Sequence, residues 1–95
     1  MSHNDSPLKD VLLQWMHGEK VQDKLLKVRI EEIWDAQWGR AFNRHMKDLR
    51  FKSGVLYIHL HSAVLRHELN LQKQILRLKL NESLGEEAIK EIRIR

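Results

Sequence analysis

The sequence predicts a small α+β domain in which helices pack on one face of a three-stranded mixed sheet. The spacing of apolar residues along the 95-residue chain is first helical, then changes to the period of 2 typical of half-buried strands, and then becomes helical again. Like elements also follow one another, in the order helix, helix, strand, strand, helix, strand, which favours α+β over alternating α/β architecture. At this length residues 1–95 are expected to form one domain.

The first predicted helix follows a polar segment, residues 1–6, which we expect to be disordered. Ser6 is a favoured helix cap, and Pro7 is a favoured first helical residue because its missing N–H is not needed there. Gly18 is suited to end the helix in a left-handed conformation. One face of this helix carries the apolar residues Leu8, Val11, Leu12, Trp15 and Met16.

The same periodicity predicts two further helices. The second covers about residues 21–38 and ends at Gly39. The third covers residues 62–84, with Ser62 as its cap and Gly85 as its end.

Alternation of apolar and polar residues predicts three strands. Residues 48–52 and 55–61 form a hairpin joined by the turn signal Ser53-Gly54. A last strand, residues 91–95, returns over the third helix, so we expect it to lie parallel to a hairpin strand through a right-handed crossover. The basic stretch 40–45 before the hairpin is either an exposed connection or a further helical turn.

The positive charge is concentrated in the middle of the chain. Residues 40–79 contain nine lysines and arginines but only two acidic residues, a net charge of +7, whereas residues 1–39 carry −2 and residues 80–95 carry −1. A region with one dominant sign of charge is typical of a surface that binds a polyanion such as nucleic acid. Basic faces also occur for solubility alone, so both interpretations stay open.

Two basic surfaces are candidates for binding nucleic acid. The first is the outward face of the hairpin, which carries Arg50, Lys52, Tyr57, His59 and His61. Cations neutralise phosphates, and a tyrosine ring gives a base a stacking platform. The alternative is that Tyr57 and Val55 pack beneath a helix while the charged residues keep a sheet edge soluble.

The second candidate is a stripe along the third helix, formed at intervals of about one turn by Arg66, Asn70, Lys73 and Arg77. Three basic residues of the preceding segment are expected to join it: Arg40, Arg44 and Lys47. Contacts of this kind are made with phosphates, so we expect little sequence preference and a steep loss of affinity with salt. A plain solvated helix face is the alternative.

Chemistry other than binding has little support. The chain has no cysteine, which excludes disulfides and thiolate ligands and fits a reducing cytoplasm. His59, His61 and His67 lack a fourth ligand at a spacing typical of zinc sites. Phosphate-binding loops, metalloprotease motifs and nucleophile elbows are missing, so we expect no enzyme activity, cofactor or metal. No apolar run approaches the roughly 20 residues that span a bilayer, so we expect no membrane partner.

Several local patterns, in their order and spacing, resemble the DciA-like family, also called domain of unknown function 721. Trp34-Asp-Ala-Gln-Trp-Gly39 places tryptophan ahead of a helix-ending glycine, and His45 follows it. The run from Leu49 to Leu69 contains the strand start Gly-Val-Leu and the helix start Ser-x-x-Leu-x-x-Glu-Leu. The similarity continues to the end, Ile-Lys-Glu-Ile-Arg-Ile-Arg, and covers about residues 20–95.

The resemblance implies a KH-like α+β domain from bacteria that serves chromosome replication. Members of the family associate with DNA and with the replicative helicase, as its loaders or operators. This sequence differs from fuller members in having no basic tail after the domain. We therefore expect helicase loading less firmly than DNA binding. It also lacks the Gly-x-x-Gly loop of true KH domains, since its four glycines never stand three apart.

The sequence thus predicts a non-enzymatic module that binds single- or double-stranded DNA with low sequence specificity and further contacts the replicative helicase. Two alternatives stay open. In the first, the chain is a protein interaction module without nucleic-acid contact, in which the first helix and the acidic first third recognise the partner. In the second, it is a KH-like RNA-binding protein.

Overall fold

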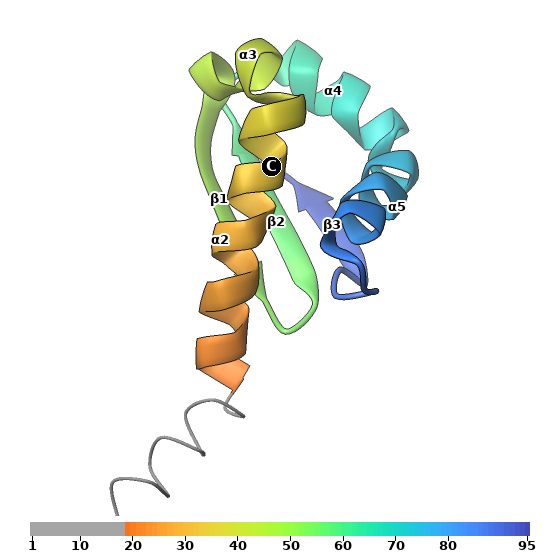
Figure 1. Ribbon diagram of the computed structural model, residues 1–95. Helices are drawn as coiled ribbons and strands as arrows, with labels where there is room; N and C mark the ends of the chain where they lie inside the picture. The colour runs from red at the N-terminus through yellow and green to blue at the C-terminus, as the bar shows by residue number, and fades with distance from the viewer. Residues whose placement is uncertain (1–18) are drawn as a thin grey trace, which may run out of the picture.

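The computed structural model describes residues 19–95 (Figure 1). The first predicted helix and the segment 1–6, for which we expected disorder, lie outside the described residues. The elements in chain order are α2 (Glu19–Gln37), α3 (Gly39–Phe42), the 3-10 turn η2 (Asn43–His45), β1 (Met46–Lys52), β2 (Val55–Leu60), α4 (Ala63–Leu71), α5 (Lys73–Leu84) and β3 (Glu91–Ile94).

This order confirms the predicted α+β class, decides one alternative that the sequence left open, and corrects one predicted helix. The stretch 40–45 lies in α3 and η2, so the helical alternative for this stretch is the right one. The predicted third helix is not continuous, because it breaks at Gln72 into α4 and α5. Gln72 has φ −114° and ψ 13°, outside the helical range, although neither glycine nor proline is nearby in the sequence.

The sheet has the strand order β1-β2-β3, with β2 in the centre. β1 and β2 are antiparallel, and β3 is parallel to β2, as predicted for the last strand. α4 and α5 form the connection from β2 to β3 (Figure 1). Ser53 and Gly54 both have positive φ, 50° and 81°, which is the conformation of the tight turns that suit the twist of a hairpin.

The core lies between the helices and one face of this sheet. Because side chains alternate along a strand, every second residue of each strand points toward α2 and α5. Ile30 and Trp34 of α2 pack here with exposed fractions of 0% and 1%. The buried strand residues of this core are Leu49, Phe51, Leu56, Ile58, Leu60 and Ile92. Burial of each such side chain contributes about 1.5–3 kcal/mol.

Asn81 of α5 fixes the loop that leads into β3. Its side-chain nitrogen donates to the backbone oxygen of Ile89, and its side-chain oxygen accepts from the backbone N–H of the same residue, both at 2.9 Å. Asn81 and Ile89 are both buried, so these two bonds form away from water. They set the position at which β3 begins beside β2.

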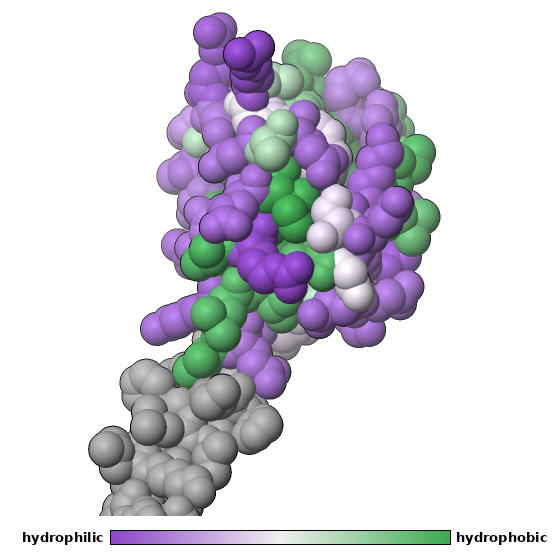
Figure 2. All heavy atoms as spheres, viewed as in Figure 1, coloured by the Kyte–Doolittle hydropathy of each residue, from purple (hydrophilic) through white to green (hydrophobic). Residues whose placement is uncertain are grey.

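Apolar side chains are also exposed on the outer surface of the helices. Figure 2 shows them along the right-hand rim of the molecule, over α5, and over the lower part of α2. On α4 and α5 we call them the outer apolar stripe; they are Val64, Leu71, Ile75 and Leu78, each more than half exposed. Leu25 and Val28 are the corresponding residues of α2.

Candidate nucleic-acid interface

The face of the sheet opposite α2 and α5 is not covered by any helix of the described part of the chain. The residues between the core positions point to this side. In the middle, Arg50 of β1 stands beside Tyr57 of β2, which stands beside Arg93 of β3. Next to that row, β1 contributes Asp48 and β2 contributes His59.

Arg95 extends this second row. Its backbone N–H donates to Ile58 O, and its carbonyl accepts from the backbone N–H of Leu60, both at 2.8 Å. In a parallel ladder this pattern places the Arg95 side chain beside that of His59. We call this side of the sheet the open-face surface and define it by Lys47, Arg50, Lys52, Tyr57, His59, Arg93 and Arg95.

Tyr57 is at the centre of the open-face surface. The guanidinium carbon of Arg95 lies 4.9 Å from the centroid of the tyrosine ring, and that of Arg93 lies 6.0 Å from it. Both distances are within the range of a cation–π contact. Beside the ring is an open hollow of about 460 Å³, lined by Lys47, Asp48, Arg50, Lys52, Tyr57, Ile58, His59 and Arg95.

Two carboxylates offset part of this positive charge. Asp48 Oδ2 lies 3.5 Å from Arg50 Nε, and Asp48 Oδ1 lies 3.9 Å from His59 Nδ1. Glu91 accepts a short hydrogen bond from Arg93 Nε, and this bond raises the pKa of Arg93 above its ordinary value. Five cations against two carboxylates leave a net charge of +3 on this face. The face is therefore basic without being uniformly so.

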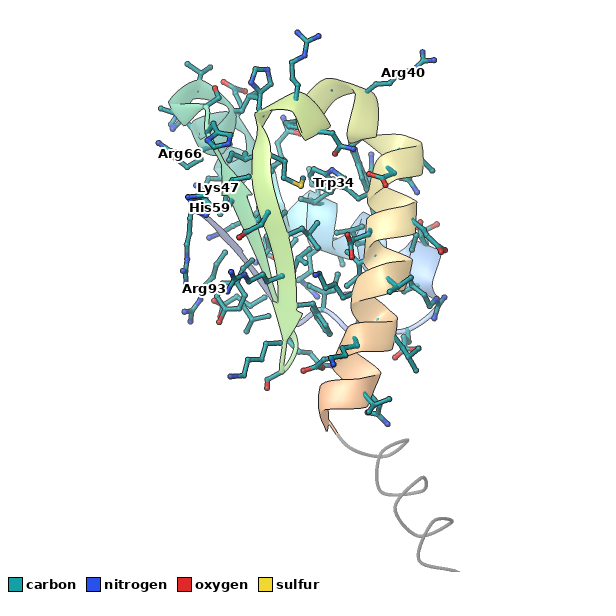
Figure 3. All side chains as sticks on the ribbon, turned by 90° about the vertical axis from the view of Figure 1, so that its left-hand side faces the viewer. Trp34, Arg40, Lys47, His59, Arg66 and Arg93 are labelled. Carbon is teal, nitrogen blue, oxygen red and sulfur yellow. The ribbon has the colours of Figure 1, made fainter. Side chains whose placement is uncertain are left out.

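The predicted helix stripe lies partly beside the open-face surface. Arg66 of α4 donates from Nη1 to Leu60 O at 2.9 Å, so it is held at the end of β2. Figure 3 shows Lys47, His59, Arg66 and Arg93 together on the side of the sheet away from α2. Lys73 lines a second groove along the free edge of β3, together with Arg93 and Arg95.

Three other predicted residues are not part of the open-face surface. The Arg77 side chain is held by two hydrogen bonds to nearby groups: its Nε donates to Gln74 Oε1 at 3.0 Å, and its Nη1 donates to Ile89 O at 3.4 Å. Arg40 of α3 points away from the sheet, on the side opposite the open-face surface (Figure 3). Arg44 is exposed in η2. The structure thus brings Lys47, Arg50, Lys52, Tyr57 and Arg66 to one side of the molecule and leaves Arg40 apart.

Two further basic residues of this side, Arg93 and Arg95, were not predicted from the sequence. Arg95 lines both the hollow beside Tyr57 and the groove along β3, whereas Arg93 lines the groove alone. The signal was present, because Ile92 and Ile94 alternate with Arg93 and Arg95. The two arginines were not chosen as candidates because residues 80–95 carry a net charge of −1. Alternation alone indicates that the arginines share one face, but only the pairing of β3 with β2 shows that this face is the one of Tyr57.

The structure decides one alternative raised by the sequence, which concerns the packing of Tyr57. Tyr57 does not pack beneath a helix of the described part; it is half-buried on the open side of the sheet. Across residues 19–95, no three histidine, aspartate or glutamate side chains are grouped as metal ligands. No helix in that range is long and apolar enough to cross a membrane.

Comparison with known proteins gives one finding. The model of a protein family described as "Dna[CI] antecedent, DciA" matches residues 7–94, nearly the whole chain. No curated protein and no solved structure matches the chain significantly. The KH-like relation that the resemblance implies therefore stays a prediction, while the family assignment rests on a match over both helical and strand regions.

Proposed function

The chain belongs to the DciA family, and we propose that it serves DNA replication by binding DNA through the open-face surface while it contacts the replicative helicase. The family is of the helicase-loader type and is not a known enzyme family. The observation that supports DNA binding is the arrangement of five basic side chains around Tyr57 on a sheet face that no described helix covers.

The chemistry of this surface suits a phosphate backbone. Lys47, Lys52 and Arg95 make no ion pair within the described residues, so they are available to neutralise phosphates. Each phosphate that is neutralised releases counterions, which makes the binding depend on salt rather than on base sequence. We therefore expect DNA of different sequences to bind with similar affinity.

The test is a charge reversal on the open-face surface with a matched control elsewhere. Lys52→Glu combined with Arg95→Glu removes two unpaired cations from the face. Arg40→Glu combined with Lys79→Glu changes the net charge equally, but at exposed positions on the helices α3 and α5. Fluorescence anisotropy with labelled DNA at about 50 mM salt reports affinity for each variant.

We expect the open-face variant to bind DNA at least about tenfold more weakly, and the control to stay within about twofold. Equal weakening in both variants would show that only net charge matters and would reject the surface. Unchanged binding in the open-face variant would reject it as well. A matched RNA oligomer distinguishes the RNA-binding alternative, which predicts tighter binding to RNA than to DNA of the same sequence.

The helicase contact belongs to a different surface. The outer apolar stripe exposes Leu71 by 69% and Ile75 by 55%, although burial of such side chains is favourable. Apolar side chains in a row along two successive helices are typical of a protein contact rather than of a nucleic-acid contact. This stripe is thus the part of the domain that best fits the helicase.

Leu71→Lys combined with Ile75→Lys tests this assignment against Leu25→Lys combined with Val28→Lys on α2. Both pairs replace exposed apolar residues, so they add the same charge at comparable cost to folding. With the purified replicative helicase of the same organism, we expect co-elution to be lost only for the α4–α5 variant, while its DNA affinity is retained. Loss in the α2 variant alone would assign the contact to α2 instead.

A further inference from the structure

Tyr57 differs from the other aromatic residues of the described chain. Trp34 and Phe51 are buried, and Trp38 and Phe42 pack against the core from the helical side. Tyr57 alone among the described aromatic residues lies on the open-face surface, half-buried, with arginines on both neighbouring strands. Cations alone are sufficient to bind phosphates, so the aromatic ring among them indicates a contact with another part of the nucleic acid.

The face of a base is accessible only when the base is unpaired and unstacked. A duplex presents phosphates and groove edges to a flat sheet, whereas a single strand presents bases whose rings can stack on an aromatic side chain. An accessible tyrosine ring on a basic face therefore favours single strands over duplexes. Cations on their own would not distinguish the two so strongly.

From this geometry we propose that the open-face surface selects unpaired single-stranded DNA, with one base stacked at Tyr57 and the flanking phosphates bound by cations of the two edge strands. This inference rests on the proposed function and specifies its substrate. Two interstrand spacings separate β1 from β3, roughly 10 Å, so Lys52 and Arg95 flank a base that lies over the central strand.

The hollow beside Tyr57 gives the base its place. Its lining includes two rings, Tyr57 and His59, and the basic side chains Lys47, Arg50, Lys52 and Arg95. The volume of about 460 Å³ is within the range of sites that hold small ligands. The guanidinium carbon of Arg95 lies 4.9 Å from the centroid of the Tyr57 ring, so the cation of β3 that binds a flanking phosphate is next to the stacked base.

The test compares two substitutions of the ring on two forms of DNA. Tyr57→Phe keeps the ring, whereas Tyr57→Leu keeps apolar volume but removes the π system. Val55→Ala is the matched control, because Val55 precedes Tyr57 on the same strand and faces the same side without a ring. The probes are a labelled single strand of about 16 nucleotides, near the upper site size of one small domain, and its blunt duplex.

We expect Val55→Ala to stay within about twofold of the unmodified protein on both probes. Tyr57→Phe keeps the ring, so it should bind the single strand more tightly than Tyr57→Leu does. Tyr57→Leu should lose between about fivefold and a hundredfold in affinity for the single strand and less than about twofold for the duplex. In a photo-crosslinking experiment, a single strand that contains 5-iodouracil should become attached to the peptide that carries Tyr57. Thermal unfolding of each variant shows whether a loss reflects folding.

The outcomes separate this inference from the proposed function. If Tyr57→Leu binds the single strand as the unmodified protein does, or weakens both probes equally, base stacking at Tyr57 is rejected while DNA binding stands. If the Lys52→Glu, Arg95→Glu variant binds both probes normally, the open-face surface itself is rejected. If the unmodified protein binds neither probe at low salt, both proposals fail together.

Discussion

At the scale of single residues, buried hydrogen bonds and left-handed turns decide how β3 is placed. Asn81 is 6% exposed and satisfies both backbone groups of Ile89, which is itself fully buried. Two arginines of the open-face surface follow Ile89 within six positions. The geometry of the candidate site thus depends on a polar residue at a distance from it.

Asn81→Ala removes the hydrogen-bond partners of the Ile89 N–H and C=O groups, and both groups stay buried. An unsatisfied buried N–H or C=O costs about 1–3 kcal/mol, so we expect the free energy of unfolding to fall by about 2–5 kcal/mol. Asn70→Ala on α4 is the control, because Asn70 is exposed, and it should change stability by less than about 0.5 kcal/mol. Urea unfolding followed by tryptophan fluorescence measures both. Similar values for the two variants would contradict the role of Asn81.

Gly54 and Gly85 test whether space or backbone conformation limits a turn. Both have positive φ, 81° and 77°, so alanine at either position costs about 1 kcal/mol in backbone strain. A Cβ at Gly54 meets Lys90 Cγ at 3.0 Å, whereas a Cβ at Gly85 meets nothing within 4 Å. Gly54→Ala should therefore destabilise the protein more than Gly85→Ala in the same urea titration. The reverse order would show that the side chain of Lys90 moves aside freely.

At the scale of elements, local signals predicted where helices and strands begin better than how they bend. Ser62 was predicted as a helix cap, and its Oγ accepts from the backbone N–H of Leu65 at 3.2 Å. The break at Gln72 was not predicted, because its cause is tertiary. α4 packs on β2 and β3, whereas α5 packs on α2 and β3, so the two halves of the predicted helix contact different elements of the fold.

Ser62→Ala removes the cap of α4 and should lower the free energy of unfolding by about 1 kcal/mol. Ser62→Asp keeps an acceptor and adds a charge that favours the helix N-terminus, so it should restore most of the loss. Chemical unfolding of the three proteins measures the difference. A loss of the same size in the aspartate variant would show that Ser62 acts by packing and not as a cap.

At the scale of the whole molecule, the sequence predicted the charge but not its distribution in space. The class, the hairpin and the parallel last strand followed from periodicity and chain connection. The candidate site followed only in part, because Arg93 and Arg95 join the face of Tyr57 through a strand pairing between residues 36 positions apart in the sequence. Arg40 and Arg95 carry the same charge, so the sequence does not show which of them belongs to the candidate site. The fold places Arg95 on the open-face surface and Arg40 on the opposite side.

The dependence of DNA binding on salt measures how many of these charges act together. Each phosphate that a cation neutralises on duplex DNA lowers the slope of log affinity against log salt by about 0.9. Three unpaired cations predict a slope near −3, and all five predict about −4.5 if Asp48 and Glu91 release their arginines. Lys52→Glu combined with Arg95→Glu should reduce the magnitude by about 2, whereas Arg40→Glu combined with Lys79→Glu should leave it nearly unchanged. Anisotropy titrations between about 50 and 200 mM salt give the slopes. A slope near zero in the unmodified protein would mean that the cations of the open face do not meet phosphates at all, whatever affinity is measured.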